Sequence, residues 1–476
     1  MQIRQYQPGD EEGISNIIVE SFGGFRRWGL TPEKWLGYEV DPGFRKENAF
    51  VAEENGEIVG HVQVVSRDLN FGRYVKVAGV ANVCTKPGDR NRGIATDLMN
   101  EVLDYSSRSY NISALDTGYA STPHRIYRRV GYSPFHVFRY FVGERWEIER
   151  TIKRLEKISD GYENVREFQS GDKGDIEKIY EANSKEIRGS YSRPQKYWEE
   201  KLFKRNSWHT FFYRPFNPKD VLVLPGRAYA YLDWEEDFIG HIPHGFSSTD
   251  QTVHRKLFIR EFLARPDDRL AMAAVLKGAL ALCAGCNEVV VLAPENDPWV
   301  DYLLADFYQL RAGDDLMVKV LNPKGLMEEI FGVGEGAGPR VQLRLYDDES
   351  FLEPVNLELA SLAPVNGQAE ARIGMYQSDF VGLLSGLTDP LGLLGQGKMA
   401  VAGDDPVYVA SAMRNALKQS PFYLWMSDHW RCEIWLSLPT NKCPLPNESS
   451  CSVGLRAALS SNILFNSLFG MADFLT

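Results

Sequence analysis

Residues 80–103 read VANVCTKPGDRNRGIATDLMNEVL, and this stretch decides how the first part of the chain folds. Residues 75–85 are apolar and rich in β-branched side chains, as a buried strand requires. Pro87-Gly88-Asp89 then interrupts the strand. After the interruption, apolar residues recur at helical spacing at Ile94, Leu98, Met99 and Val102. The stretch therefore predicts a strand, a turn and a helix whose first turn contains residues 92–95.

The first turn of this helix can bind an anion. Backbone N–H groups there have no intrahelical acceptor, and the helix dipole adds partial positive charge. Arg90 and Arg92 contribute full charges, and Gly93 lets a ligand approach the backbone without a Cβ in the way. The three-glycine spacing of a dinucleotide fold and the Gly-Lys-Ser/Thr of a P-loop are both absent. An ordinary strand-turn-helix connection with a solvated basic rim is the alternative.

The six residues at the turn resemble a known signature. Arg90-Asn91-Arg92-Gly93-Ile94-Ala95 is similar to the Gln/Arg-x-x-Gly-x-Gly/Ala motif of the GCN5-related N-acetyltransferases (GNAT). In that superfamily the amides of the motif hold the pyrophosphate of coenzyme A. The resemblance therefore implies a coenzyme A cradle formed by Arg90, Asn91, Arg92, Gly93, Ile94 and Ala95.

Composition describes an ordinary soluble globular protein. The chain has 476 residues, 44% of them hydrophobic, and this length favours two to four domains. A net charge of −11 argues against a nucleic-acid partner and suits cationic ones. No apolar run reaches the roughly 18 residues of a membrane span, and the first residues lack a signal peptide, so a cytoplasmic location is expected. Six cysteines are too few for a disulfide scaffold, and no metal site is expected.

The opening of the chain occurs twice. IRQYQPGDEEGISNII from Ile3 and VREFQSGDKGDIEKIY from Val165 align without a gap, 162 residues apart. A repeat of domain size indicates duplication, so each copy is expected to be one domain with the same strand-helix start.

The first copy continues with a loop rich in aromatic residues. We expect Phe22, Phe25, Trp28 and Trp35 to line a substrate pocket, with the edge of the core as the alternative place for these rings. Asn55-Gly56 between two apolar segments predicts a type I′ hairpin. A short strand at residues 112–115, a helix from Pro123 and a last strand at about residues 135–142 follow.

Ile126-Tyr127-Arg128-Arg129-Val130-Gly131-Tyr132 looks like a second GNAT signature. With the cradle, the repeat and the C-terminal part, it resembles the enhanced intracellular survival (Eis) family. The resemblance implies an α/β fold with a catalytic GNAT domain at residues 1–150 and a degenerate one at residues 151–321. An α+β sterol-carrier-like domain would follow at residues 322–476, where strands and helices alternate; whether it binds a lipid stays open.

The second copy lacks the centre of the cradle. Aligned with the first copy, Ala271 stands where Arg92 does, and Met272 where Gly93 does. We expect the long Met272 side chain to obstruct the approach of pyrophosphate, so that this copy binds no coenzyme A.

The resemblance also implies a chemistry. The strand before the cradle would present the backbone N–H of Val83 to the thioester carbonyl, and Val83 and Thr85 would pair with the pantetheine arm. Tyr127 is the expected general acid, since a phenol suits protonation of a thiolate. The C-terminal carboxylate, here that of Thr476, would be the general base.

The expected function is direct transfer of acetyl from acetyl-CoA to a primary amine. The acceptor would be a polyamine-like or aminoglycoside-like cation or a lysine, and another acyl-CoA donor is not excluded. A non-catalytic scaffold or a lipid-binding protein is the alternative function. The resemblance further implies a homo-oligomer, with six subunits in that family.

Overall fold

The computed structural model describes residues 1–417 and 421, apart from several short segments. The segments outside the description are residues 23–24, 27–28, 119–120, 205–214, 239–252, 284–285, 287, 336–337 and 348–349. Trp28 and Thr476 therefore lie outside the described residues.

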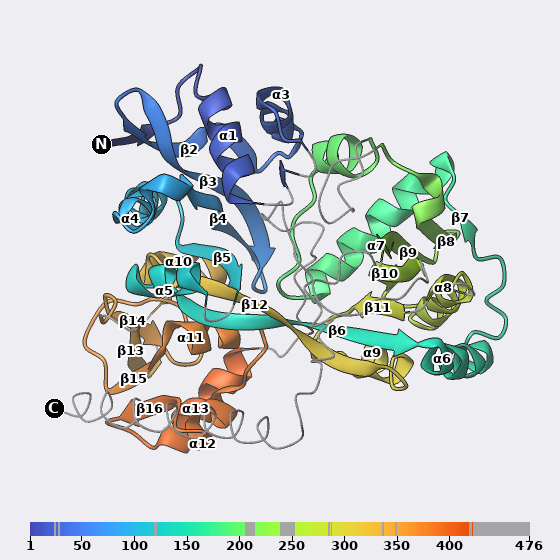
Figure 1. Cartoon of the computed structure of the whole chain (residues 1–476). Helices are drawn as coiled ribbons and strands as arrows, with labels where there is room; N and C mark the ends of the chain where they lie inside the picture. Colours follow the sequence, from blue (N-terminus) through green and yellow to red (C-terminus); the bar gives the residue numbers. More distant parts are fainter. Residues whose placement is uncertain are drawn as a thin grey trace, which may run out of the picture.

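The first copy has the predicted order of elements, except that a short helix, α3, lies in the aromatic segment expected to be a loop (Figure 1). They are β1 (Gln2–Gln5), α1 (Glu11–Ser21), α3 (Pro32–Leu36), β2 (Phe44–Glu54), β3 (Glu57–Asn70), β4 (Tyr74–Thr85), α4 (Ile94–Ser107), β5 (Ile112–Gly118), α5 (Thr122–Arg129) and β6 (Ser133–Glu144). Asn55 and Gly56 both have positive φ, 53° and 80°, which confirms the predicted type I′ turn between β2 and β3.

Helices cover both faces of the first copy's sheet. Alternate residues of β2 and β3 point to opposite faces, as the pleat of a strand dictates. Val51 and Val65 share one core cluster with Ile14 of α1. Phe50 and Val62 share another cluster with Leu98 of α4. The cradle helix and α1 thus pack on opposite sides of the same strands.

The second copy repeats the order after the linking helix α6 (Arg145–Ile158). Its elements are β7 (Arg166–Glu167), α7 (Lys173–Glu186), β8 (Val221–Leu224), β9 (Ala228–Phe238), β10 (Val253–Ala264), α8 (Leu270–Ala281), β11 (Glu288–Leu292), α9 (Pro298–Leu303) and β12 (Tyr308–Val320). The duplication inferred from the sequence is thus visible in the order of strands and helices.

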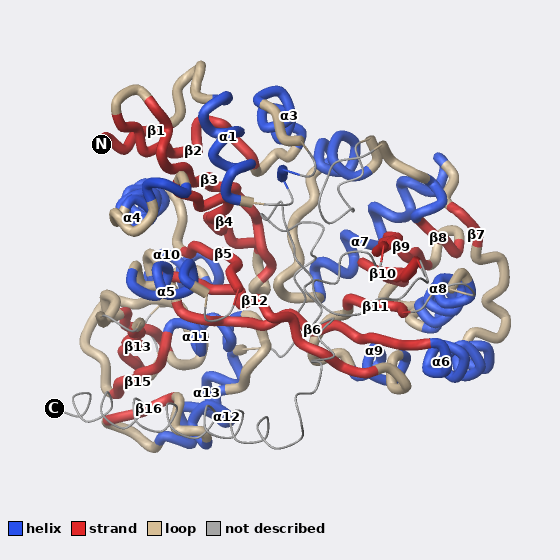
Figure 2. The backbone as a smooth tube through the Cα atoms, viewed as in Figure 1, coloured by secondary structure: helices blue, strands red, loops and turns tan. Residues whose placement is uncertain are grey.

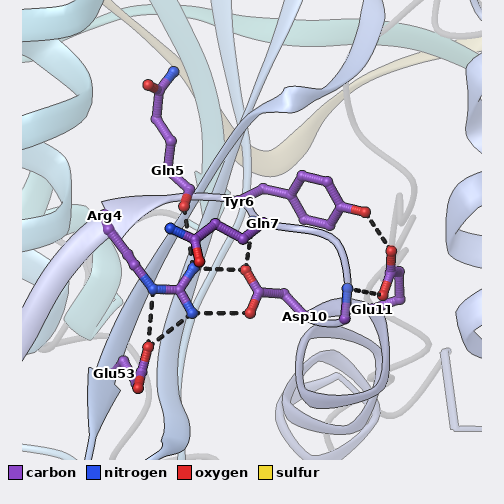
Figure 3. A network of polar contacts seen from close by, with 8 residues as sticks. Arg4, Gln5, Tyr6, Gln7, Asp10, Glu11 and Glu53 are labelled. Carbon is purple, nitrogen blue, oxygen red and sulfur yellow. Dashed lines mark hydrogen bonds and ion pairs between the residues drawn. The ribbon is translucent and has the colours of Figure 1, made fainter.

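The repeated sequence opening forms the same contact in both copies. Asp10 accepts from Arg4 Nη1 and Nη2 at 2.7 and 2.9 Å and from the Gln7 amide at 2.7 Å (Figure 3). In the second copy, the carboxylate of Asp172 makes the corresponding bonds to Arg166, at 2.7 and 2.8 Å, and to the Gln169 amide at 2.7 Å. A charged pair with this geometry fixes the turn that leads from the first strand into the first helix.

The two copies exchange their last strands. The first sheet has twelve strands in the order β1-β2-β3-β4-β5-β12-β6-β11-β10-β9-β8-β7. β12 of the second copy pairs with β5 of the first, and β6 of the first copy pairs with β11 of the second. β12 and β6 also pair with each other, so the strands run as one continuous band through both copies (Figure 2). The division of the chain at residues 150 and 321 stays a prediction.

A third unit packs beneath β5 and β12 (Figure 1). It has a second sheet in the order β14-β13-β15-β16 and contains the α+β mixture that the sequence predicts. α10 (Pro323–Phe331) leads into this unit and contacts β4 of the first copy. The unit's further elements are β13 (Arg340–Tyr346), β14 (Val355–Glu358), β15 (Ala371–Tyr376), α11 (Gln377–Leu384), α12 (Pro390–Gly395), β16 (Met399–Ala402) and α13 (Pro406–Ala416).

A buried charge cluster joins the first copy to the second. Asp41, which follows a short 3₁₀ turn (Gly37–Val40), accepts from Arg67 of β3 at 2.6 and 2.9 Å. Lys201, in a π-helical turn (Tyr197–Leu202) of the second copy, donates to the same carboxylate at 2.6 Å. Burial raises the pKa of the Asp41 carboxyl, but the charges of Arg67 and Lys201 outweigh this effect and hold the pKa well below its usual range.

We expect Asp41→Asn to lower the free energy of unfolding by about 3–5 kcal/mol, because it removes the carboxylate that two buried cations share. Denaturation in urea, followed by tryptophan fluorescence, measures the change. Because the pKa of Asp41 is depressed, the contribution is present above its unfolded pKa of about 3.9 and disappears as pH falls through the folded value.

The double variant Asp41→Asn/Lys201→Met is the control for this change. It removes one of the two cations together with the carboxylate and should recover part of the loss. A loss below about 1 kcal/mol for Asp41→Asn alone would show that the cluster contributes little.

Candidate active site

The site begins where β4 separates from β5. The two strands pair in parallel only at Val77–Ile112, Ala78–Ser113 and Gly79–Ala114. Residues 80–85 of β4 have no register partner in β5, so the described strands diverge there. On the side that faces β5, the backbone N–H and C=O groups of residues 80–85 therefore form no ladder with the described strands.

The other edge of β4 carries a bulge that the sequence did not predict. The pairs His61–Cys84 and Gln63–Ala81 enclose one residue of β3 but two of β4, Asn82 and Val83. Asn82 has φ 53°, in the left-handed region. Asparagine tolerates this region better than most residues do. An asparagine within a strand rich in valine was therefore the sequence feature that could have indicated the bulge.

The turn after β4 forms an open helix N-terminus. Asn91 (φ 65°) and Gly93 (φ 86°) are both left-handed, and a Cβ on Gly93 would meet no atom within 4 Å. α4 begins at Ile94, so the prediction that Arg92 and Gly93 belong to its first turn is wrong. No side chain caps the helix, and its first backbone bond runs from Asp97 N to Gly93 O at 3.0 Å. The amides before Asp97 are available to an anion.

The two arginines of the cradle are not equivalent. Arg92 makes a bidentate ion pair with Glu54, at 2.8 and 2.9 Å, and a further bond to Asp89. The hydrogen bonds that Arg92 donates to Glu54, and then those to Asp89, raise the pKa of Arg92. Among the described residues, Arg90 makes one long contact, 3.5 Å from Nε to the Thr85 carbonyl. Because the Arg92 pairs are exposed, a phosphate can exchange for either carboxylate at little cost.

Tyr127 lies beside the cradle helix. It projects from α5 into the core cluster that contains Leu98 and Met99 of α4, and 6% of its surface is exposed. Its ring lies edge-on to Tyr132, with centroids 6.3 Å apart. Tyr132 in turn contacts Ser113 Oγ at 2.6 Å, and Ser113 donates to Ala78 O at 2.8 Å. The second signature is thus connected to β4 just before the divergence.

The aromatic residues expected in a substrate pocket lie mainly in the core. Phe25 and Trp35 are 1% and 0% exposed, which matches the alternative interpretation of these rings. Phe22 is half-buried and lies 6.0 Å from Phe25, centroid to centroid. Their role in substrate binding stays a prediction, and it requires rearrangement of this segment.

The second copy differs in the way its helix begins. α8 starts at Leu270, so the residue aligned with Gly93 is already helical. Met272 is 4% exposed and packs into the core, so the prediction that its side chain projects into the cradle is wrong. The helix itself occupies the position of the left-handed turn. The Arg269 side chain, at the helix start, is held by Asp297 at 2.6 Å.

An ion pair fills the centre of the second copy. Arg193 binds Glu261 of β10 at 2.8 and 3.2 Å, and both side chains are fully buried. The guanidinium lies 3.6 Å from the Tyr180 ring centroid and 4.9 Å from that of Trp198. Glu261 sits three residues before the end of its strand, as Asn82 does in β4. β10 and β11 also diverge beyond Ile259, and these side chains fill the region between them.

Within the described part of the chain, no His, Cys, Asp and Glu side chains are grouped as a metal site would require. No described helix combines the length and hydrophobicity of a membrane span.

Comparison with known proteins agrees with this geometry. Residues 2–135 match the family described as "Acetyltransferase (GNAT) domain". An uncharacterized N-acetyltransferase of Methanocaldococcus jannaschii is 25% identical over 162 residues, which are 32% of this chain and 66% of that protein.

Two solved structures resemble almost the whole chain. A GCN5-related N-acetyltransferase from Kribbella flavida has a TM-score of 0.60 at 17% identity, covering 89% of this chain and 97% of its own. Eis1 from Mycobacterium abscessus has a TM-score of 0.55 at 16% identity, covering 89% and 99%. The chain therefore shares the fold of these multi-domain proteins, including the tandem GNAT arrangement.

We expect Gly93→Trp to weaken acetyl-CoA binding by well over tenfold, or more than about 1.4 kcal/mol. Its side chain would enter the open space in front of the amides. Calorimetric titration with acetyl-CoA measures the affinity.

Gly161→Trp is the matched control for this substitution. Gly161 has φ 80° and equally open space around its Cβ position, so the backbone strain is similar but the cradle is untouched. Equal affinity in the Gly93 variant and the wild type would rule out the cradle.

Proposed function

We propose that this chain, which belongs through its first copy to the GNAT N-acetyltransferases, transfers acetyl from acetyl-CoA to a primary amine of a cationic acceptor. The observation that supports this most is the left-handed turn at Asn91 and Gly93, which leaves the N-terminus of α4 open beside the divergent half of β4. In the second copy, the aligned positions are occupied by a helix start and a buried ion pair.

The first copy has groups for both ends of the donor. The amides at Asn91–Thr96 and the two arginines suit a pyrophosphate, since helix N-termini bind anions. The unpaired edge of β4 after Gly79 suits the amide-rich pantetheine arm, which can add to the strand as a peptide would. Val83 and Thr85 are the residues we assign to this pairing.

The chemical step needs an oxyanion donor and two proton transfers. The amine nitrogen attacks the thioester carbon, the C–S bond breaks, and the thiolate takes a proton from the Tyr127 phenol. The Val83 amide stabilises the oxyanion of the tetrahedral intermediate. A base accepts the proton that the amine loses; Thr476 stays the candidate from the family resemblance.

The acceptor class is inferred from charge. A net charge of −11 favours the approach of polyamines, aminoglycosides or lysine side chains over that of anions. A screen of such amines with acetyl-CoA, in which thiol release is followed, tests the class directly.

We also propose that the chain forms a homo-oligomer. Trp146, Tyr302 and Tyr308 are 49–55% exposed on α6, α9 and β12, which are elements of the same end of the molecule. Large exposed aromatic side chains are typical of contact surfaces between subunits. Mass photometry gives the number of subunits.

Calorimetric titration with acetyl-CoA tests the number of working copies. We expect one site per chain, because only the first copy has the left-handed turn at the helix start. Two sites would contradict our interpretation of α8, and no binding would favour a scaffold without turnover.

Tyr127→Phe should lower kcat by about 10²-fold, within the usual range for loss of a general acid, with acetyl-CoA affinity nearly unchanged. Steady-state kinetics with the best amine measures this. The control is Tyr105→Phe, which removes a hydroxyl that binds Asn48 at 2.7 Å from the same core layer. An unaltered kcat in the Tyr127 variant would remove this residue from the mechanism.

A further inference from the structure

A buried histidine contacts the bulge from the neighbouring strand. His61 of β3 is fully buried, and its Nδ1 lies 3.2 Å from the carbonyl oxygen of Asn82. A carbonyl oxygen can only accept, so Nδ1 carries the proton and donates. Burial lowers the pKa of His61 to about 4, so the ring is neutral near pH 7 and Nε2 is its unprotonated nitrogen. The Trp35 ring is nearly perpendicular to the imidazole, with centroids 6.3 Å apart.

This contact fixes the direction of one peptide group. The described chain has no cis peptide bond, and in a planar trans peptide the C=O and the N–H point in opposite directions. The carbonyl of Asn82 and the amide of Val83 belong to the same peptide. When the carbonyl is held toward His61, the Val83 N–H points away from it. At a bulge, the ladder itself does not impose this direction, because Asn82 and Val83 have no register partner in β3.

The second copy has a contact at the corresponding position, but it joins two side chains and does not involve a backbone carbonyl. The β3–β4 ladder ends at the pair Gly60–Thr85, and the β9–β10 ladder ends at Ala228–Ala264. One residue in from these ends, His61 of β3 corresponds to Tyr229 of β9. Three residues in, Asn82 of β4 corresponds to Glu261 of β10.

There, the Tyr229 hydroxyl bonds to the Glu261 side chain instead of to a backbone carbonyl. The backbone contact is thus present in the copy with the open cradle, and a side-chain contact replaces it in the other.

We propose that His61 is a positioning residue, which directs the Val83 amide toward the thioester carbonyl by holding the carbonyl of Asn82. The inference rests on the proposed acetyl transfer. In this proposal His61 does not contact the substrate. The rate of acetyl transfer depends on the Nδ1–H donor of His61 and not on the aromatic ring itself.

The first test compares two substitutions at His61. His61→Leu removes the donor, whereas His61→Asn offers a side-chain N–H from nearly the same place as Nδ1. We expect kcat to fall by about 10- to 100-fold in the leucine variant, up to the usual loss of one oxyanion donor, with the KM for acetyl-CoA changed less than about threefold. The asparagine variant should recover most of kcat.

Two results of this comparison would overturn the proposal. One is an unchanged kcat in His61→Leu. The other is an equal fall in both variants that follows their loss of thermal stability, which would show a packing role only.

Tyr229→Phe is the matched control in the second copy. It removes the hydroxyl that contacts Glu261, at the position aligned with His61. We expect a lower melting temperature and an unchanged kcat. A fall in kcat comparable to that of His61→Leu would mean that either contact acts through general stability, and it would overturn the specific role of the bulge.

Hydrogen–deuterium exchange separates this inference from the proposed function, because it needs no acceptor amine. Acetyl-CoA should slow exchange at residues 82–85 and at residues 91–96 of the wild type. In His61→Leu, the slowing should be lost at residues 82–85 and kept at residues 91–96. Unchanged protection at both segments would overturn the role of His61. A wild type that protects both segments but acetylates no amine would refute the proposed function alone.

Discussion

The backbone ladder between β5 and β12 holds the first copy's sheet together where its chemistry is placed. Seven residue pairs join the two strands, from Ile112–Val320 to Gly118–Asp314, whereas only three join β5 to β4. β5 is therefore held mainly by a strand from the second copy. Since β5 supports β4 just before the two diverge, the width of this opening depends on a segment about 200 residues further along the chain.

This dependence gives the second copy a structural role even without a cradle. Its centre is filled by Arg193 and Glu261, a fully buried pair whose partners also include the Tyr229 hydroxyl. A buried ion pair is tolerated only when its hydrogen bonds are satisfied. Here the Tyr229 hydroxyl donates to Glu261, and the rings of Tyr180 and Trp198 lie against the guanidinium of Arg193. By contrast, the Arg–Asp contact that opens both copies is unchanged. The two copies therefore differ in their centres but share the turn that leads from the first strand into the first helix.

The third unit contacts the second signature of the first copy. The fully buried Gln377 of α11 donates to Gly131 O at 2.7 Å and to Ser133 Oγ at 2.9 Å, and it accepts from Val320 N at 2.8 Å. One amide side chain therefore joins the ends of β6 and β12 to the unit that follows them. The position of Tyr127 relative to the cradle is in this way supported by three parts of the chain.

Local patterns predicted much of this arrangement. Residue type and spacing were sufficient to predict the strand, turn and helix around Gly93, the turn at Asn55-Gly56 and the duplication. The exchange of β6 and β12 could not be predicted, because both have ordinary strand patterns and pairing partners are set by long-range packing. The burial of Trp35 was undecided for a similar reason, since an aromatic ring suits a pocket and a core equally well. The bulge at Asn82 depends on a single left-handed residue, which hydrophobic periodicity does not detect.

The strand exchange also has a consequence for biosynthesis. During translation the first copy emerges with β5 and β6 formed, but β11 and β12 follow only after some 150 further residues, which at about 5–20 residues per second takes many seconds. Until then, the edge of β5 is without its later partner, and such an edge readily pairs with other chains. The sheet of the nascent protein therefore closes only once β12, which ends at Val320 of the 476 residues, has been synthesised, and its strand edge is open to pairing with other chains until then.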